Sequence, residues 1–178
     1  NITSLRGTIA DNWVANGEIQ RRSAWTIATD TNAGKDITIT GDLVYATRPD
    51  KSQPLDAPCN LAAGTLGIVA QDIKIADDGT PYYRHYNREL NCVMLAGSST
   101  VDGSISVQNY DRGTTGTLKV IGGLIQSTRG PVGTINSSGN IATGYAKDYH
   151  YDRRLASAPP PHYPTTGSYD RISWEVIY

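Results

Sequence analysis

The chain has 178 residues, of which 38% are hydrophobic and 19% are charged, and its 16 Lys and Arg against 17 Asp and Glu give a formal net charge of −1. This length predicts one domain, or one domain with an extension. The balanced charge excludes a strongly basic nucleic-acid trap, and no apolar run reaches the roughly 18 residues of a membrane span. The chain begins at Asn1 without an apolar leader, which indicates a segment of a longer mature protein.

Short strands are the elements predicted along most of the chain. Apolar residues alternate with polar or small residues in four stretches, which begin at Ile37, Leu66, Leu90 and Leu118 and end near turn-forming residues. Further short strands are predicted between them, at residues 25–28, 72–76 and 104–107.

Two of these stretches share one pattern. Residues 37–44 and 118–125 both read apolar-x-apolar-x-Gly-x-Leu-apolar, and Leu66 and Cys92 divide the distance between them into steps of about 27 residues. A strand that recurs at such a period is typical of solenoids, in which stacked coils bury their aliphatic side chains together. The sequence therefore predicts an all-β fold, a parallel β-helix (β-solenoid), right-handed because parallel crossovers are almost always so. The alternative is an antiparallel sandwich.

The pattern changes after residue 128. A turn-rich bridge is followed by a predicted strand at 144–151, an extended proline-rich segment at 158–164 and a last strand at 169–178. An open solenoid end exposes a sheet edge and needs a cap. We therefore expect residues 1–128 to form the solenoid coils, and residues 129–178 to form a C-terminal cap or extension packed on them.

The two cysteines, Cys59 and Cys92, lie 33 residues apart, which fits no zinc or redox motif. A disulfide between them would indicate an exported protein. Cys92 also lies in a strand pattern where it points inward, and a buried free thiol is common there. The sequence leaves both alternatives open.

The order of several segments resembles a known family. The chain from about residue 25 onward is similar to the C-terminal β-solenoid region of bacterial cell-surface proteins, namely large minor pilins and type IV pilus-associated proteins, including competence pilins. The segments that carry the resemblance are residues 39–45, 66–72, 122–134, 144–155 and 159–164. The family is largely of unknown function. The resemblance implies an exported bacterial protein at the cell surface, with other pilin subunits or cell-surface components as partners.

A candidate ligand-binding segment interleaves aromatic and cationic residues: Tyr82, Tyr83, Arg84, His85, Tyr86 and Arg88. Aromatic stacking combined with cationic contacts holds single-stranded nucleic acid, and Tyr and Arg also anchor protein interfaces and sugar sites. DNA and a glycan are therefore the candidate ligands. The structural alternative is a loop or edge whose tyrosines cover the wall of the fold.

A second candidate is the alternating row Asp148, His150 and Asp152, whose side chains point to one side of a strand. Such a row suits a metal site or acid–base chemistry, but a metal needs further ligands that the spacing does not provide. We interpret the row as a solvent-facing polar surface. The chain also lacks phosphate-loop, dinucleotide, nucleophile-elbow and zinc-protease motifs, so no catalytic residue, metal or cofactor is predicted.

These observations predict a non-enzymatic extracellular module that displays a binding surface for adhesion or DNA uptake and does not itself enter a membrane. One alternative is a polysaccharide-active β-helix enzyme, which needs a cluster of carboxylates on one wall. The other is a purely structural spacer.

Overall fold

The computed structural model describes residues 4–5, 18–19, 21–29, 31, 34–76, 87–112 and 114–164. Within them, strands dominate and group into three sheets. The four-stranded sheet is parallel throughout, with the spatial order β1 (Ser4–Leu5), β4 (Ile37–Ile39), β7 (Ile73–Ile75) and β9 (Ile105–Val107). A two-stranded parallel sheet pairs β2 (Glu18–Ile19) with β5 (Val44–Tyr45).

The six-stranded sheet forms the other large layer. Its order is β11 (Gly133–Ile135), β12 (Ile141–Tyr151), β10 (Thr114–Gln126), β8 (Arg88–Ala96), β6 (Thr65–Ala70) and β3 (Ala24–Ala28). All its pairs are parallel except β11 with β12. Two short helical elements complete the described part, α1 (Pro58–Ala62) and the 3-10 helix η1 (Arg153–Ala156).

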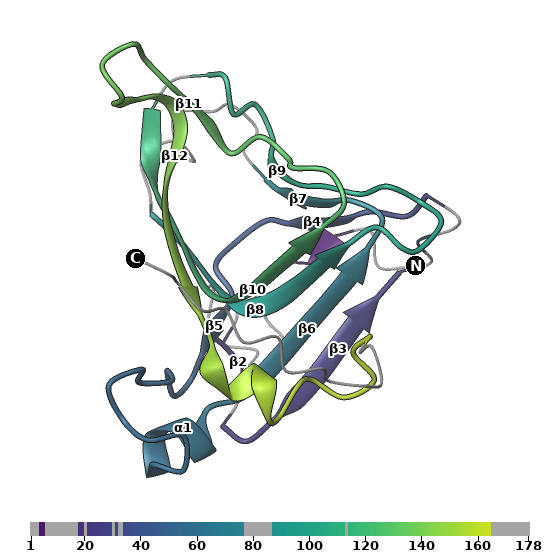
Figure 1. The fold of residues 1–178 in the computed structure, drawn as a ribbon, viewed down its shortest axis with the longest axis vertical. Coiled ribbons are helices and arrows are strands. Elements are labelled where there is room, and N and C mark those ends of the chain that lie inside the picture. Colours follow the sequence, from purple (N-terminus) through teal and green to yellow (C-terminus); the bar gives the residue numbers. More distant parts are fainter. Residues whose placement is uncertain are drawn as a thin grey trace, which may run out of the picture.

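The hydrophobic core lies between the two large sheets (Figure 1). From β3 to β10 the chain passes alternately from one to the other, apart from β5 in the two-stranded sheet. Each sheet turns its aliphatic side chains inward, and those that are completely buried include Ile37, Ile39, Leu66, Ile68, Ile73, Leu90 and Met94. Burial of each such side chain contributes about 1.5–3 kcal/mol. The alternation of apolar and polar residues in the sequence is therefore what fixes the inner face of each strand.

Polar side chains set the register where the strands of the four-stranded sheet begin. Asp36 precedes β4, and its carboxylate accepts a hydrogen bond from the backbone N–H of Asp72 at 3.2 Å. Asp72 precedes β7 and accepts in the same way from the N–H of Ser104 at 2.7 Å. Because each bond reaches from one strand start to the next, the three starts are tied together at one edge of the fold.

The predicted parallel β-helix is wrong. Ile39 pairs with Ile75 in the four-stranded sheet, whereas Ile68 pairs with Met94 in the six-stranded sheet, so the expected single ladder through residues 39, 68 and 120 does not exist. The spacing between paired residues is also uneven, as Trp25 opposite Leu66 is 41 residues away while Ile68 opposite Met94 is 26 residues away. The six-stranded sheet is mixed, because β11 is antiparallel to β12.

The error has a simple physical cause. Every half-buried strand shows the same alternation of apolar and polar residues, whichever sheet it joins. The matched segments 37–44 and 118–125 therefore belong to different sheets, although both bury the same alternating aliphatic positions. The antiparallel sandwich fails as well, since one pair alone, β11 with β12, is antiparallel among the strands that the structure describes.

The C-terminal part of the described chain joins the large sheet and then crosses its outer face. β12 lies beside β10, with Leu118 opposite Lys147. After η1, Tyr163 packs with Val69, Val93 and Leu155, and it lies so close to Gly67 that a β-carbon there would stand 2.5 Å from the Tyr163 ring. Gly67 is therefore needed for this close approach. The predicted strand at 169–178 lies outside the described residues.

Candidate functional site: a charged groove beside β10 and β12

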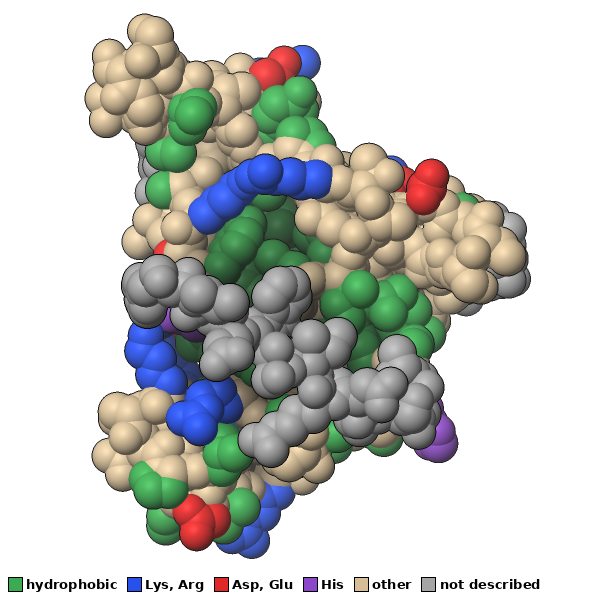
Figure 2. Space-filling view, in the orientation of Figure 1, with side chains coloured by type: hydrophobic (Ala, Val, Ile, Leu, Met, Phe, Trp, Pro, Cys, Tyr) green, Lys and Arg blue, Asp and Glu red, His purple; other side chains and the backbone are tan. Residues whose placement is uncertain are grey.

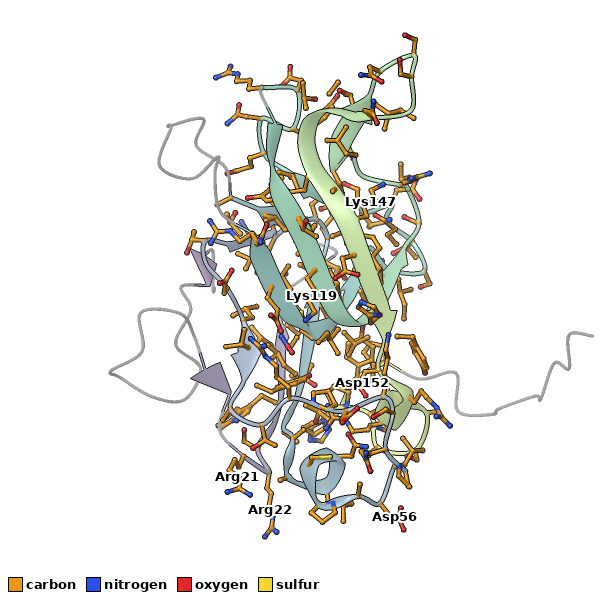
Figure 3. The ribbon with its side chains drawn as sticks, turned by 90° about the vertical axis from the view of Figure 1, so that its left-hand side faces the viewer. Arg21, Arg22, Asp56, Lys119, Lys147 and Asp152 are labelled. Atoms are coloured by element: carbon orange, nitrogen blue, oxygen red, sulfur yellow. The ribbon has the colours of Figure 1, made fainter. Side chains whose placement is uncertain are left out.

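A cavity of about 440 Å³ lies between the loop of residues 48–55 and the outward-facing side chains of β10, β12 and η1. We call it the charged groove, and its principal polar and aromatic side chains are Arg48, Lys51, Lys119, Asp148, His150 and Tyr151. Figure 3 shows Lys119 on this face of the sheet, with Asp152 toward α1. The volume lies in the range of small-molecule sites.

The loop wall of the charged groove is held in place by Asn60 in α1. This side chain is 4% exposed, and its Oδ1 accepts a hydrogen bond from the N–H of Asp50 at 2.8 Å. Its amide nitrogen donates to the carbonyl oxygens of Asp50 at 3.1 Å and Pro54 at 2.8 Å. Pro58 begins α1, a position where proline's fixed φ favours a helix start. The loop is therefore preorganised by one buried amide.

A buried ion pair fixes the opposite end of the charged groove. Arg154 donates to both carboxylate oxygens of Asp152, from Nε to Oδ1 at 3.0 Å and from Nη2 to Oδ2 at 2.6 Å. The same guanidinium donates to the carbonyl oxygens of Ala63 and Gly64, and it lies 5.4 Å from the centre of the Tyr45 ring. Bidentate pairs of this kind are strong and directional. Arg154 thus joins η1 to the residues that follow α1.

His150 lies between an anion and a cation. Its Nε2 is 2.7 Å from Oδ1 of Asp148, and its Nδ1 is 3.3 Å from Nζ of Lys51. A lysine ammonium can only donate, so Nδ1 accepts from Lys51 and the ring proton is on Nε2, donated to Asp148. Both ring nitrogens are therefore engaged, and the imidazole links β12 to the loop wall.

Glu89 neutralises two cations at the rim of the groove. Its Oε2 is 3.1 Å from Nη2 of Arg48 and 3.8 Å from Nζ of Lys119. The Arg48 side chain remains 58% exposed, whereas Glu89 is 16% exposed. One carboxylate shared by two cations leaves both cations with N–H groups directed to solvent. The rim therefore offers mainly hydrogen-bond donors.

Of the predicted ligand-binding residues, Arg88 alone lies in the part of the chain that the structure describes. Tyr82, Tyr83, Arg84, His85 and Tyr86 lie outside the described residues. Arg88 is 9% exposed, and its Nη1 is 3.7 Å from Oδ1 of Asp42, so it is buried at the start of β8.

Cys59 and Cys92 are both free thiols in the structure. Cys92 is completely buried in β8, and this burial raises the pKa of its thiol to about 12. A thiol with such a pKa stays protonated near neutral pH and is a poor nucleophile. Cys59 lies in α1 and is partly exposed.

The alternating row of β12 separates into two parts. All three residues line the charged groove, but Asp148 and His150 contact each other on β12, whereas Asp152 is buried against Arg154 at the end of the groove. Lys51 and Asn60 were missed by sequence reasoning, because their contacts with His150 and Asp50 depend on how the loop folds back. Within the part of the chain that the structure describes, no group of three or more His, Cys, Asp or Glu side chains could hold a metal ion. Nor is any helix there long and apolar enough to span a bilayer.

Comparisons with protein families, with characterised proteins and with solved structures find no match for this chain. The resemblance to type IV pilus-associated proteins therefore stays a prediction. The geometry of the charged groove is what indicates a function.

Proposed function

We propose that the protein is a non-enzymatic extracellular binding module of a type IV pilus-associated protein, and that its charged groove holds an acidic glycan. The observation that carries this proposal is the preorganised mixture of donors and acceptors around His150, with a cationic rim at Arg48 and Lys119. Preorganisation lowers the entropic cost of binding, which matters for a flexible, hydroxyl-rich ligand.

Binding suits the groove better than hydrolysis. Each carboxylate that lines it is already engaged: Asp50 with Ser52, Asp148 with His150 and Asp152 with Arg154. The hydrogen bond from the Ser52 side chain, followed by that from its backbone, lowers the pKa of Asp50. Glycoside hydrolysis needs one protonated carboxyl group as acid and a second carboxylate free to act as base or nucleophile. The groove offers neither.

A sugar chain also suits the groove better than DNA. Phosphate groups only accept hydrogen bonds, and the carboxylates of Asp50 and Asp148 would repel them. Sugar hydroxyl groups both donate and accept, so they can use these carboxylates as well as the cationic donors. Tyr151 lines the groove and is 62% exposed, which provides an aromatic face against which a sugar ring can pack. An acidic substituent on the sugar would lie at the Arg48 and Lys119 rim.

The test is isothermal titration of the whole chain with a uronic-acid hexasaccharide, a neutral hexasaccharide of glucose and a short single-stranded DNA. We expect saturable binding of the acidic sugar, with the neutral sugar and the DNA at least about tenfold weaker. The double variant Lys51→Gln with Lys119→Gln should weaken acidic-sugar binding by about tenfold or more, because each charge-assisted hydrogen bond contributes about 1.5–3 kcal/mol.

Arg112→Gln is the matched control, since Arg112 is exposed and does not line the groove. Its affinity should equal that of the parent chain. Equal affinity for the acidic and neutral sugars would contradict the role of the cationic rim. Retention of DNA binding without sugar binding would replace the proposal with nucleic-acid recognition.

A further inference from the structure

A second hollow lies between the two large sheets, beside β12. It has a volume of about 210 Å³, and its floor is the core itself, formed by Met94, Leu118, Val120 and Leu124 with Ile75, Ile105 and Val132. Figure 2 shows a hollow lined by hydrophobic side chains, with a cationic side chain across it. We call it the inner cavity. A smaller hollow that shares Val120, Leu124 and Tyr149 with it continues along Gly122 and Gly123.

Two cations border this apolar space. Lys147 lies opposite Leu118 in the pairing of β12 with β10, and Tyr149 lies opposite Val120. Leu118 and Val120 are 1% and 2% exposed, so the alternation of the strand directs Lys147 to the inner side, where an aliphatic residue is expected. Arg129 lines the same cavity from the segment after β10.

The two cations also affect each other. Partial burial and then the nearby Arg129 charge lower the pKa of Lys147. Neither side chain has an ion-pair partner among the residues that the structure describes. Both side chains are exposed, so solvent screens much of their mutual repulsion, and an anion bound between them removes the remainder.

We propose that the inner cavity binds one amphipathic monoanion, a free medium-chain fatty acid, with its aliphatic chain among Met94, Leu118 and Val120 and its carboxylate at Lys147 and Arg129. An apolar cavity of about 150 Å³ suffices to hold benzene, so the inner cavity has room for a short aliphatic chain, which the adjoining hollow extends. A carboxylate supplies an anion to these two cations, and an arginine guanidinium binds it in two-point geometry. This inference does not depend on the proposed function, because Lys147 and Arg129 line the inner cavity and not the charged groove, although the adjoining hollow reaches His150 and Tyr151 of the groove.

The experiment is isothermal titration of the whole chain with hexanoate, octanoate and decanoate, each below its micelle concentration. We expect one molecule per chain, with affinity rising by up to about fourfold per added methylene until the cavity is full. Octylammonium should not bind measurably, and 1-octanol should bind at least about tenfold more weakly than octanoate. A stoichiometry of several molecules per chain would indicate surface adsorption and overturn the proposal.

The decisive variant is Lys147→Gln combined with Arg129→Gln. It should lower octanoate affinity by at least about tenfold while leaving 1-octanol affinity unchanged, because only the carboxylate contact is removed. Arg112→Gln is the matched control, since Arg112 is exposed and lines neither the inner cavity nor the adjoining hollow, and octanoate affinity should not change. Unchanged octanoate affinity in the double variant, or equal affinity for octanoate and 1-octanol, would overturn the carboxylate site.

The glutamine changes lie at the mouth of the cavity, so they should leave the fold intact, which circular dichroism checks. A second, independent measurement is carbon-13 NMR of carboxyl-labelled octanoate. The pKa of the bound carboxyl group should lie below its value in free solution, because two cations stabilise the charged form. A bound carboxyl group with an unchanged or raised pKa would contradict the placement at Lys147 and Arg129.

Discussion

The charged groove lies against the outer face of β10 and β12, and the inner cavity lies between the two large sheets, yet their charges are arranged in opposite ways. On the outer face, Lys119 lies near Glu89, and His150 contacts Asp148. On the inner face, Lys147 has Arg129 as its charged neighbour. Among the described residues, the cations of the outer face have carboxylate partners, whereas Lys147 and Arg129 form no ion pair.

Because of this difference, we expect the two surfaces to bind different kinds of ligand. Where carboxylates of the chain already neutralise the cations, an added anion must compete with them, so binding depends on geometry and on many weak contacts. Where two cations border an apolar cavity without a described carboxylate, an added anion removes an unfavourable interaction directly. The groove therefore suits a large polar ligand, and the inner cavity suits a small amphipathic one.

The largest effect is expected from Arg154→Ala, which removes the cation that pairs with the buried Asp152 carboxylate at the end of the groove. Asp152 would remain buried at 4% exposure without its bidentate partner, and the carbonyl groups of Ala63 and Gly64 would lose their donors. Breaking a buried ion pair in this way costs about 3–5 kcal/mol. Urea unfolding should show this loss in the free energy of unfolding.

The control for this variant is the neighbouring Arg153→Ala, because Arg153 is exposed. Its free energy of unfolding should change by about 0.5 kcal/mol or less. A loss below about 1 kcal/mol in Arg154→Ala would show that Arg154 does not hold the end of the groove.

The sequence predicted some of these features and could not predict others. Alternation in residues 66–70 and 90–96 is enough to predict which side chains face the core, since the hydrophobic effect acts on each strand separately. Alternation does not show which strand lies beside which. It therefore cannot show that Ile39 pairs with Ile75 in one sheet while Ile68 pairs with Met94 in another. Partner choice depends on how the intervening loops cross between sheets, which no local pattern encodes.

The candidate site shows the same division. The common side of Asp148 and His150 follows from their spacing on one strand, but the Lys51 contact joins residues 99 positions apart. Arg154 pairs with Asp152, two residues before it in the sequence. Its additional bonds to Ala63 and Gly64 could not be predicted, because they depend on the placement of α1 against η1.

A smaller effect, of opposite sign, is expected from Lys147→Met. Lys147 is exposed, so solvent screens its repulsion with Arg129, and replacing it with an apolar side chain beside Leu118 should stabilise the protein by about 0.5 kcal/mol or less. Lys119→Met on the outer face should be neutral or destabilising, because it removes a partner of Glu89. Thermal unfolding at neutral pH compares the two variants, and stabilisation by both would show that their environments do not differ.

The pH dependence of the Lys147→Met effect follows from its lowered pKa. The unfolded chain holds the Lys147 proton up to a higher pH than the folded chain does. Stability of the parent chain should therefore gain from this residue as the pH rises through the lowered pKa toward the ordinary lysine value. The advantage of Lys147→Met should shrink across that interval. Burial also raises the pKa values of Tyr45 and Tyr163, and this makes stability fall as the pH rises into the tyrosine range. Both tyrosines are present in the parent chain and in the variant, so they do not change the comparison.

The smallest effect is expected from Glu89→Gln, which removes the carboxylate that the two cations at the rim of the groove share. Arg48 and Lys119 would lose their shared carboxylate, while the amide keeps an oxygen that can still accept from Asn91. Affinity for an acidic hexasaccharide should rise by about threefold, since surface pairs contribute about 0–1 kcal/mol, and the gain should fade at high salt. Octanoate affinity should not change. A fall in acidic-sugar affinity would mean that Glu89 positions the two cations for the ligand and does not compete with it.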